Sequence, residues 1–198
     1  WITSGATQEA ALAVSIDGVS AIRLMCWFSS LVFNVFDPVS FRPWQNTTVV
    51  PNTYPSGLGS GLFNSTDNNC FGSQKLFNFE YRYTDTSSRR KMMDFMRDVI
   101  PNGSYVVIRN FTLNPIFGFP DAWAADWAAD EALHGPGQSL YHYIKNAGLS
   151  SIDSFYRARP WALIYKKNDP SFTPKWVMGD GMFDNPTFSG PATIVLPA

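Results

Sequence analysis

The stretch of the chain over residues 85–167 repeats one pattern twice: a capped amphipathic helix, an abrupt stop and a buried strand. In the first copy, the side-chain oxygens of residues 85–87 can accept hydrogen bonds from the free amides of a helix start. Pro101-Asn102-Gly103 then ends the helix, and the β-branched and aromatic residues 105–108 predict a strand. The apolar residues that recur at helical spacing between these signals are Met92, Phe95, Met96 and Val99.

The second copy opens at Gly135-Pro136-Gly137, which predicts the start of another helix. Asn146 followed by Gly148 predicts that this helix ends in a left-handed C-cap. After a link over residues 150–159, residues 161–165 again have the composition of a core strand. The helix residues that share one apolar face are Leu140, Tyr141 and Ile144. Helices that alternate with strands in this way predict a mixed fold.

Further strands are predicted on both sides of this stretch. Residues 76–83 alternate aromatic with polar side chains, which is typical of a strand with one apolar face. Residues 37–72 are rich in Pro, Asn, Ser, Thr and Gly, so we expect a long loop there. The predicted strands outside residues 85–167 are 11–16, 21–28, 31–36, 76–83, 176–178 and 193–196.

Length and composition favour one domain and exclude several classes of partner. With 198 residues, 45% of them hydrophobic, the chain can bury one sizeable core, so we expect a single domain over residues 1–198. The net charge of -1 predicts no nucleic-acid partner, and the lack of a long apolar run predicts no membrane insertion. Aromatic and charged residues at 16% each are typical of secreted recognition modules. Because the chain begins at Trp1, with no initiator methionine and no recognisable export signal, we expect a piece of a larger extracellular protein, and we expect this piece to be monomeric.

Residues with catalytic or metal-binding chemistry are sparse. His134 and His142 are too few for a metal cluster and match no metalloprotease motif. Cys26 and Cys70 are too few for a structural zinc site, and they can be either one disulfide or two buried thiols. The carboxylates of residues 121–131 lie on one short segment and do not form a glycosidase pair. We therefore expect no enzyme, no metal and no cofactor.

Two tryptophans suggest a binding surface instead. Trp123 and Trp127 are four residues apart, so they project from the same face of a helix. Indole faces stack on sugar rings, and a neighbouring carboxylate such as Asp126 can take the sugar hydroxyls. The alternative is that both indoles pack on the core. Arg157 likewise can present its guanidinium to a ligand or bridge to Asp153.

Five segments of the chain together resemble a known domain. They are Leu31-Val-Phe-Asn-Val-Phe-Asp37-Pro38, Ile100-Pro-Asn-Gly103, Ser104-Tyr-Val-Val-Ile108, Asn146-Ala-Gly148 and Tyr156-Arg-Ala-Arg-Pro-Trp-Ala-Leu-Ile-Tyr-Lys-Lys167. In this order they resemble the interleukin-like EMT inducer (ILEI) domain, also called the GG domain, over about residues 20–180. That family occurs in pancreatic-derived-factor cytokines, in the stem of protein O-mannose N-acetylglucosaminyltransferase and in large surface proteins of type IX secreting bacteria.

The resemblance implies an α+β fold of two twisted, mainly antiparallel β-sheets with helices packed on one side. It also implies a non-catalytic role, because the domain binds carbohydrate in the transferase stem and signals in the cytokines. The chain departs from the family pattern at Arg157-Ala158-Arg159-Pro160-Trp161, which is one residue longer than the usual R-D-x-W. An acidic turn of the family is replaced by residues 110–113, and its Gly-Lys-Gly ending by residues 165–167.

These observations lead to one expected function and one alternative. We expect a non-catalytic, extracellular or cell-surface module that binds carbohydrate as part of a larger bacterial protein. Its partner is then a glycan. The alternative is a structural or protein-interaction domain that supports a neighbouring sortase-like peptidase domain, with the tryptophans at the contact between domains. The expected ligand-binding residues are Trp123, Asp126, Trp127, Arg157 and Trp161.

Overall fold

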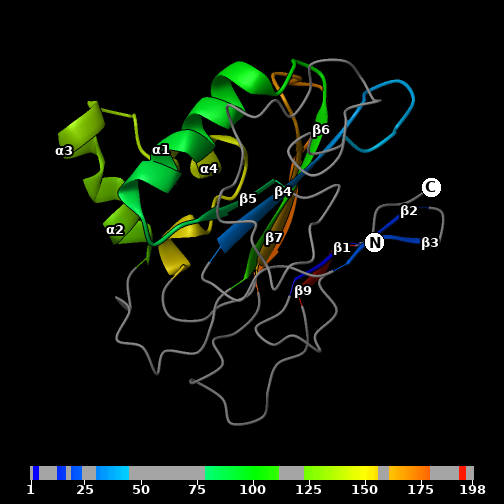
Figure 1. The fold of residues 1–198 in the computed structure, drawn as a ribbon, viewed down its shortest axis with the longest axis horizontal. Coiled ribbons are helices and arrows are strands. Elements are labelled where there is room, and N and C mark those ends of the chain that lie inside the picture. Colours follow the sequence, from blue (N-terminus) through cyan, green and yellow to red (C-terminus); the bar gives the residue numbers. More distant parts are fainter. Residues whose placement is uncertain are drawn as a thin grey trace, which may run out of the picture.

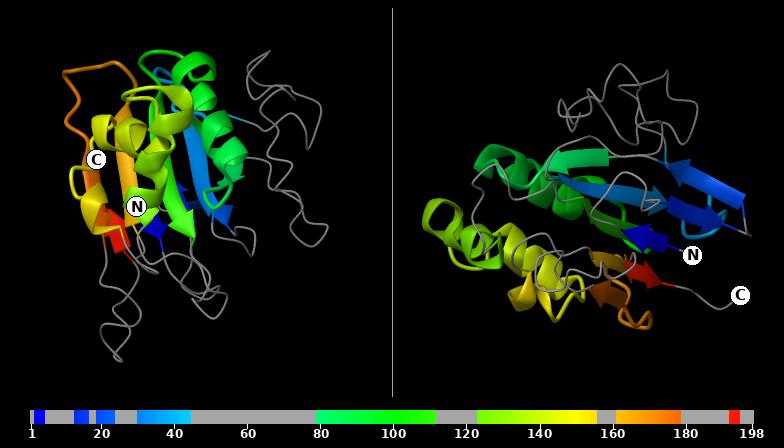
Figure 2. Two further views of the ribbon diagram at one scale, coloured as in Figure 1. Left: turned by 90° about the vertical axis from the view of Figure 1, so that its left-hand side faces the viewer. Right: turned by 90° about the horizontal axis from the view of Figure 1, so that it is seen from below.

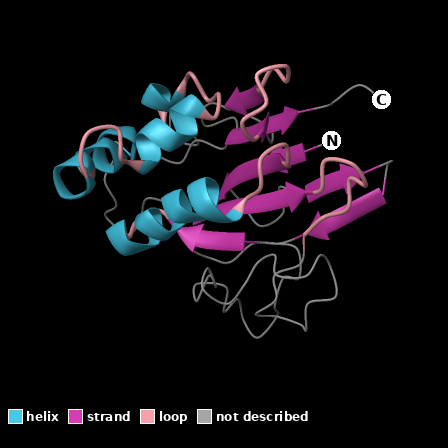
Figure 3. Ribbon diagram, turned by 90° about the horizontal axis from the view of Figure 1, so that it is seen from above, coloured by secondary structure: helices cyan, strands magenta, loops and turns pink. Residues whose placement is uncertain are grey.

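The computed structural model describes residues 2–4, 13–16, 19–23, 30–44, 79–111, 123–155, 161–178 and 192–194. Five of the described strands form one antiparallel sheet in the order β5-β4-β6-β7-β8 (Figure 1). Helices cover one face of this sheet, so the fold is of the mixed α+β class (Figures 2 and 3). The strands are β4 (Ser30–Phe36), β5 (Phe79–Arg82), β6 (Tyr105–Phe111), β7 (Trp161–Lys166) and β8 (Lys175–Met178).

Four other strands pair antiparallel with their neighbours in the order β3-β2-β1-β9. They are β1 (Ile2–Ser4), β2 (Ala13–Ile16), β3 (Val19–Arg23) and β9 (Ala192–Ile194). β1 lies beside β6 and β7, on the side away from α1 and α2 (Figure 1). Each strand predicted from the sequence overlaps one described strand. β1 was not predicted, because three residues are too few to show an alternation of side chains.

The helices predicted in the two copies of the repeated pattern are present, as is the helix expected to carry Trp123 and Trp127. α1 (Thr86–Asp94) begins at Asp85, whose Oδ1 accepts hydrogen bonds from the amides of Ser87 and Ser88 at 2.7 and 3.3 Å. The helix continues as a π-helical turn over Phe95–Val99, which the sequence did not indicate. α4 (Leu140–Asn146) follows the predicted start, and α2 (Trp123–Ala129) and the short α3 (Glu131–His134) precede it.

The main core lies between the helices and one face of the five-stranded sheet. Phe95 is fully buried there, and its ring lies 5.7 Å from that of Phe33, 5.0 Å from Phe79 and 5.8 Å from Tyr81. Phe79 and Tyr81 are two of the alternating aromatic residues of the predicted strand, so the period-two pattern identified the core-facing side correctly. The predicted loop over residues 37–72 is described only as far as Trp44.

The opposite face of the sheet contains a buried polar group. Arg109 on β6 is fully buried and donates from Nη2 to Oδ1 of Asn34 on β4 at 2.8 Å. Burial lowers the pKa of Arg109 to about 10, while nearby Glu80 acts in the other direction. Ser30 in turn donates to Glu80 at 2.5 Å. This face therefore has charged and polar residues in its interior, whereas the helix-covered face is mainly apolar.

Gly148 ends α4 in a backbone conformation that other residues rarely adopt. Its φ of 119° is in the region that favours glycine, as the predicted C-cap requires. In addition, a Cβ on Gly148 would lie only 2.4 Å from Cβ of Pro174. The turn after α4 is thus fixed both by its own backbone and by the connection between β7 and β8.

We predict that Gly148→Ala lowers the free energy of unfolding by about 2–3 kcal/mol, because it adds a steric clash to the backbone strain. Gly137→Ala is the matched control, since Gly137 also has positive φ (72°) but nothing within 4 Å of an added Cβ. Gly137→Ala should lower the free energy of unfolding by about 1 kcal/mol. Urea unfolding of both variants measures the difference, and equal losses would show that Pro174 does not constrain the turn.

Candidate functional site

The three tryptophans predicted to bind ligand lie in the core. Trp123 and Trp127, on α2, are 2% and 0% exposed, and Trp161, at the start of β7, is 0% exposed. An indole stacks on a sugar only where its face is accessible. The structure therefore corrects the prediction that these side chains form a ligand face, and it agrees with the alternative that α2 packs its indoles on the core.

The aromatic cluster around Tyr83 explains this burial. The ring of Tyr83 lies 4.8 Å from Trp123 and 5.5 Å from Trp127, both edge to face. Phe155 lies 5.2 Å from Trp127 and 5.8 Å from Trp161, so it connects α2 to β7. Trp127 Nε1 also donates to the Tyr83 carbonyl at 3.2 Å. The pattern of two tryptophans four residues apart thus marks a helix-to-sheet contact.

Asp126 and Arg157 do not complete a surface site either. The Asp126 side chain is 39% exposed and forms an ion pair with Arg89 Nη1 at 3.1 Å. Arg89 is itself buried and holds Asp130 through two hydrogen bonds of 2.6 and 2.8 Å. Asp126 therefore belongs to a network that ties α1 to α2. Arg157 lies outside the described residues.

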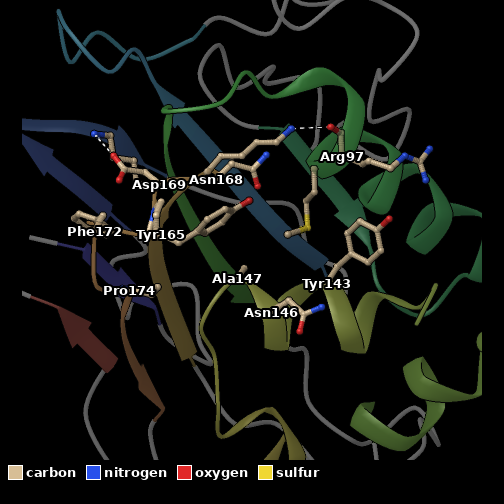
Figure 4. Close-up of a pocket in the computed structure, with 13 residues that line it drawn as sticks. Arg97, Tyr143, Asn146, Ala147, Tyr165, Asn168, Asp169, Phe172 and Pro174 are labelled. Carbon is tan, nitrogen blue, oxygen red and sulfur yellow. Dashed lines mark hydrogen bonds and ion pairs between the residues drawn. The ribbon is translucent and has the colours of Figure 1, made fainter. Parts of the chain in front are cut away.

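A pocket of about 640 Å³ lies elsewhere, at one end of the five-stranded sheet (Figure 4). The π-helical turn contributes Met96 and Arg97, and the last turn of α4 contributes Tyr143, Asn146 and Ala147. The rest of the wall comes from the end of β7 and the connection to β8, at residues 165–170, 172 and 174. A volume in this range is typical of small-molecule sites, so this pocket is the candidate functional site.

Tyr165 is the most informative residue of the pocket. It is 7% exposed, and its hydroxyl has no hydrogen-bond partner among the residues that the structure describes. Burial raises the pKa of this phenol further above neutral pH, where a tyrosine hydroxyl is already protonated. In Figure 4 the ring extends from β7, and its hydroxyl points away from Phe172 toward the space bounded by Asn168 and Tyr143. A ligand in the pocket could both donate to this hydroxyl and accept from it.

The walls around Tyr165 are held by hydrogen bonds within the protein. Lys167 is 8% exposed and donates from Nζ to the carbonyls of Arg97 and Ile100, which fixes β7 to the end of the π-helical turn. Burial lowers the pKa of Lys167. Asn168 has a positive φ of 53° and donates to Oδ1 of Asn102 at 2.7 Å. The pocket is therefore built largely in advance of any ligand.

The charged groups of the pocket are mostly paired with one another. Lys166 Nζ lies 2.7 Å from Asp169, and this ion pair, with hydrogen bonds from Ser171, lowers the pKa of Asp169 to about 2. Arg97 pairs with Asp94 and Asp98 at 2.7 and 2.6 Å. These pairs reduce the attraction of the pocket for a strongly charged ligand.

A second polar group joins α3 to the start of α4. His142 Nδ1 contacts both Glu131 and Ser139 Oγ, the latter at 3.0 Å. A serine nucleophile needs the carboxylate and the hydroxyl on opposite nitrogens of the histidine, whereas here both meet the same nitrogen. Ser139 is also fully buried and caps α4 by accepting from the amide of His142. This arrangement stabilises a helix start and does not form an acyl-transfer relay.

Neither metal ligands nor a membrane helix are found in the described part of the chain. Across these residues, no three His, Cys, Asp or Glu side chains come together as a metal site. No described helix is long and apolar enough to cross a bilayer. Cys26 and Cys70 lie outside the described residues, so their predicted alternatives stay open.

Sequence reasoning missed the pocket, although it identified two of the elements that build it. Residues 161–165 were predicted as a core strand and Asn146 as part of a C-cap, and each was interpreted only as structure. The one available signal was the turn-forming run Asn168-Asp169-Pro170 directly after an aromatic strand end. Nothing in the sequence indicated that this turn meets the last turn of α4.

Comparison with known proteins identified no relative of this chain. No protein-family model, no curated protein and no solved structure matches the chain. The resemblance to the ILEI domain stays a prediction from the sequence.

Proposed function

We propose that this domain is a non-catalytic module that binds carbohydrate in the pocket around Tyr165, as part of a larger secreted or cell-surface protein. The observation that carries the proposal is the Tyr165 hydroxyl, which has no partner among the described residues and belongs to a largely buried ring in the wall of a preformed pocket. A phenol hydroxyl can donate one hydrogen bond and accept another, so a ligand hydroxyl in the pocket could pair with it.

The other lining residues support a neutral, hydroxyl-rich ligand. Tyr143 and Phe172 offer aromatic surface, and Asn146 and Asn168 offer amides that can both donate and accept. The Asn146 side chain is exposed and has no hydrogen-bond partner among the described residues. Aromatic faces beside amide groups suit a sugar, which has apolar ring faces and polar edges.

The proposal includes the finer architecture that the ILEI resemblance implies. We interpret the β3-β2-β1-β9 set as the second sheet of a two-sheet scaffold whose helices lie on the far side of the first sheet. In this interpretation the pocket lies at the end of the scaffold where helix ends meet the connection between β7 and β8.

We predict that Tyr165→Phe weakens binding of a recognised glycan by about 3- to 10-fold, because it deletes one hydrogen bond and keeps the buried ring. The test is a glycan array followed by calorimetric titration of the best sugar. Tyr141→Phe is the control, because Tyr141 bonds to Asp153 at 2.6 Å and does not line the pocket. It should leave sugar affinity unchanged.

Two results would count against the proposal. Wild-type protein that binds no sugar on the array, but binds tightly to a neighbouring domain of its parent protein, would favour the structural or interaction role. Equal affinity of the wild type and Tyr165→Phe for a bound sugar would place the sugar outside this pocket.

A further inference from the structure

Three aromatic rings from separate segments form a row beside the pocket. Phe41 lies 5.6 Å from Tyr105, and Tyr105 lies 5.5 Å from Phe172, measured between ring centroids. We call these three residues the aromatic row. Phe172 also lines the pocket, so the row meets the pocket at the end of the sheet, although Tyr105 and Phe172 pack on the face opposite to that of Tyr165. Figure 1 shows the loop after β4, the start of β6 and the connection before β8 at the same end of the sheet.

The loop that carries Phe41 is held in one conformation by its own hydrogen bonds. Asp37 Oδ1 accepts from the amides of Val39 and Ser40 at 3.0 and 2.7 Å, and from the Ser40 hydroxyl at 2.9 Å. The Phe41 amide donates to the Asp37 carbonyl at 3.0 Å. These bonds lower the pKa of Asp37, the Ser40 amide contributing most.

Phe41 is nevertheless exposed and strained. Its side chain is 55% exposed, and its φ is 55°, which is rare for a bulky residue. Strain of this kind persists only where the surrounding structure holds it, and it is found mostly at binding sites. The loop therefore presents a large apolar ring to solvent at a fixed place.

Polar groups lie along the same row. Lys166 Nζ lies 5.2 Å from the centroid of the Tyr105 ring and pairs with Asp169 at 2.7 Å. Aromatic surface with an ammonium and a carboxylate at its edge offers a stacking face together with donors and acceptors for hydroxyl groups.

We propose that the aromatic row is a second subsite, and that the ligand is an extended oligosaccharide which occupies the pocket and the row together. The proposal rests on the proposed function, because it assigns the row to the same ligand. Continuity through Phe172 favours a sugar chain as the occupant over a separate partner. Sugar units beyond the pocket would then stack on Tyr105 and Phe41.

The test uses linear gluco-, manno- and xylo-oligosaccharides of increasing length, titrated calorimetrically into the protein. For the series that binds, affinity should rise with length. Phe41→Asn should remove that gain, a loss of about 3- to 10-fold for the long oligomers, and leave the monosaccharide unchanged. Asparagine is chosen because it tolerates positive φ, so the loop keeps its conformation. Phe41→Tyr should keep the gain with length.

Two controls separate this inference from the proposed function. Val39→Ala changes a more exposed residue of the same loop, 84% exposed and outside the row, and should bind like wild type. Tyr165→Phe should weaken short and long sugars alike. Binding that is independent of length, or equal losses for short and long sugars in Phe41→Asn, would overturn the second subsite alone. A wild type that binds none of the oligomers would overturn the subsite together with the proposed function.

Discussion

Replacing Trp127 with alanine should lower the free energy of unfolding by about 3–5 kcal/mol, the usual cost of deleting a buried aromatic side chain. Trp127 is fully buried and packs on Tyr83 and Phe155 at ring distances of 5.5 and 5.2 Å. The variant also leaves the Tyr83 carbonyl without the indole as a donor. Urea unfolding followed by circular dichroism measures the loss.

Trp176→Ala is the matched control for Trp127→Ala. Trp176 is 37% exposed on β8, so its removal should cost about 1 kcal/mol or less. Trp127→Phe should recover part of the loss, since a ring remains in the cluster. Similar stabilities of Trp127→Ala and Trp176→Ala would contradict the burial of the aromatic cluster.

Trp127→Ala is unsuitable as a test of sugar binding. A loss of 3–5 kcal/mol is a large part of the stability of a typical domain, so Trp127→Ala can lose ligand simply by unfolding. Loss of binding in that variant says nothing about indole contact with a sugar. Substitutions that leave the core intact, such as Tyr165→Phe, separate binding from stability.

Replacing Asp130 with alanine should lower the free energy of unfolding by about 3 kcal/mol, because it leaves the buried Arg89 guanidinium without its main partner. Asp130 holds Arg89 by hydrogen bonds of 2.6 and 2.8 Å, and the two side chains are 5% and 4% exposed. We expect the lower end of the usual range, because Asp126 and the Tyr83 carbonyl still contact Arg89. Equilibrium unfolding in urea measures this loss.

Two further variants test the cause of that loss. Arg90→Ala breaks an exposed ion pair with Asp94 at 3.2 Å and should cost less than about 1 kcal/mol. Arg89→Met combined with Asp130→Leu removes both buried charges, and it should be more stable than Asp130→Ala alone. If the double variant is the less stable of the two, the cost comes from lost packing and the buried charge is not its cause.

Much of the fold could be predicted because its signals are local. The Asp85 cap, the spacing of Met92, Phe95 and Met96, and the glycine at position 148 each depend on residues within one or two turns. The π-helical turn at Phe95–Val99 was missed, since its apolar spacing is the same as that of an ordinary helix. The pairing of β1 with β9 was also missed, because it joins opposite ends of the chain.

The candidate site could not be predicted in the same way. Helical spacing correctly placed Trp123 and Trp127 on one face, but it does not say whether that face meets solvent or core. Tyr165 was identified as a strand residue, and only its neighbours in space make its hydroxyl available to a ligand. Burial and accessibility depend on contacts between distant segments, which periodicity does not contain.

The sequence by itself determined the approximate positions of most helices and strands, because caps, turns and side-chain periods act over a few residues. The tertiary structure alone decided which side chains meet. It buried the indoles around Tyr83 and Phe155, and it brought the end of the π-helical turn, the last turn of α4 and the connection between β7 and β8 around one pocket. The physical reason is that a binding site needs surface left open after the core has packed, and packing is a property of the whole chain.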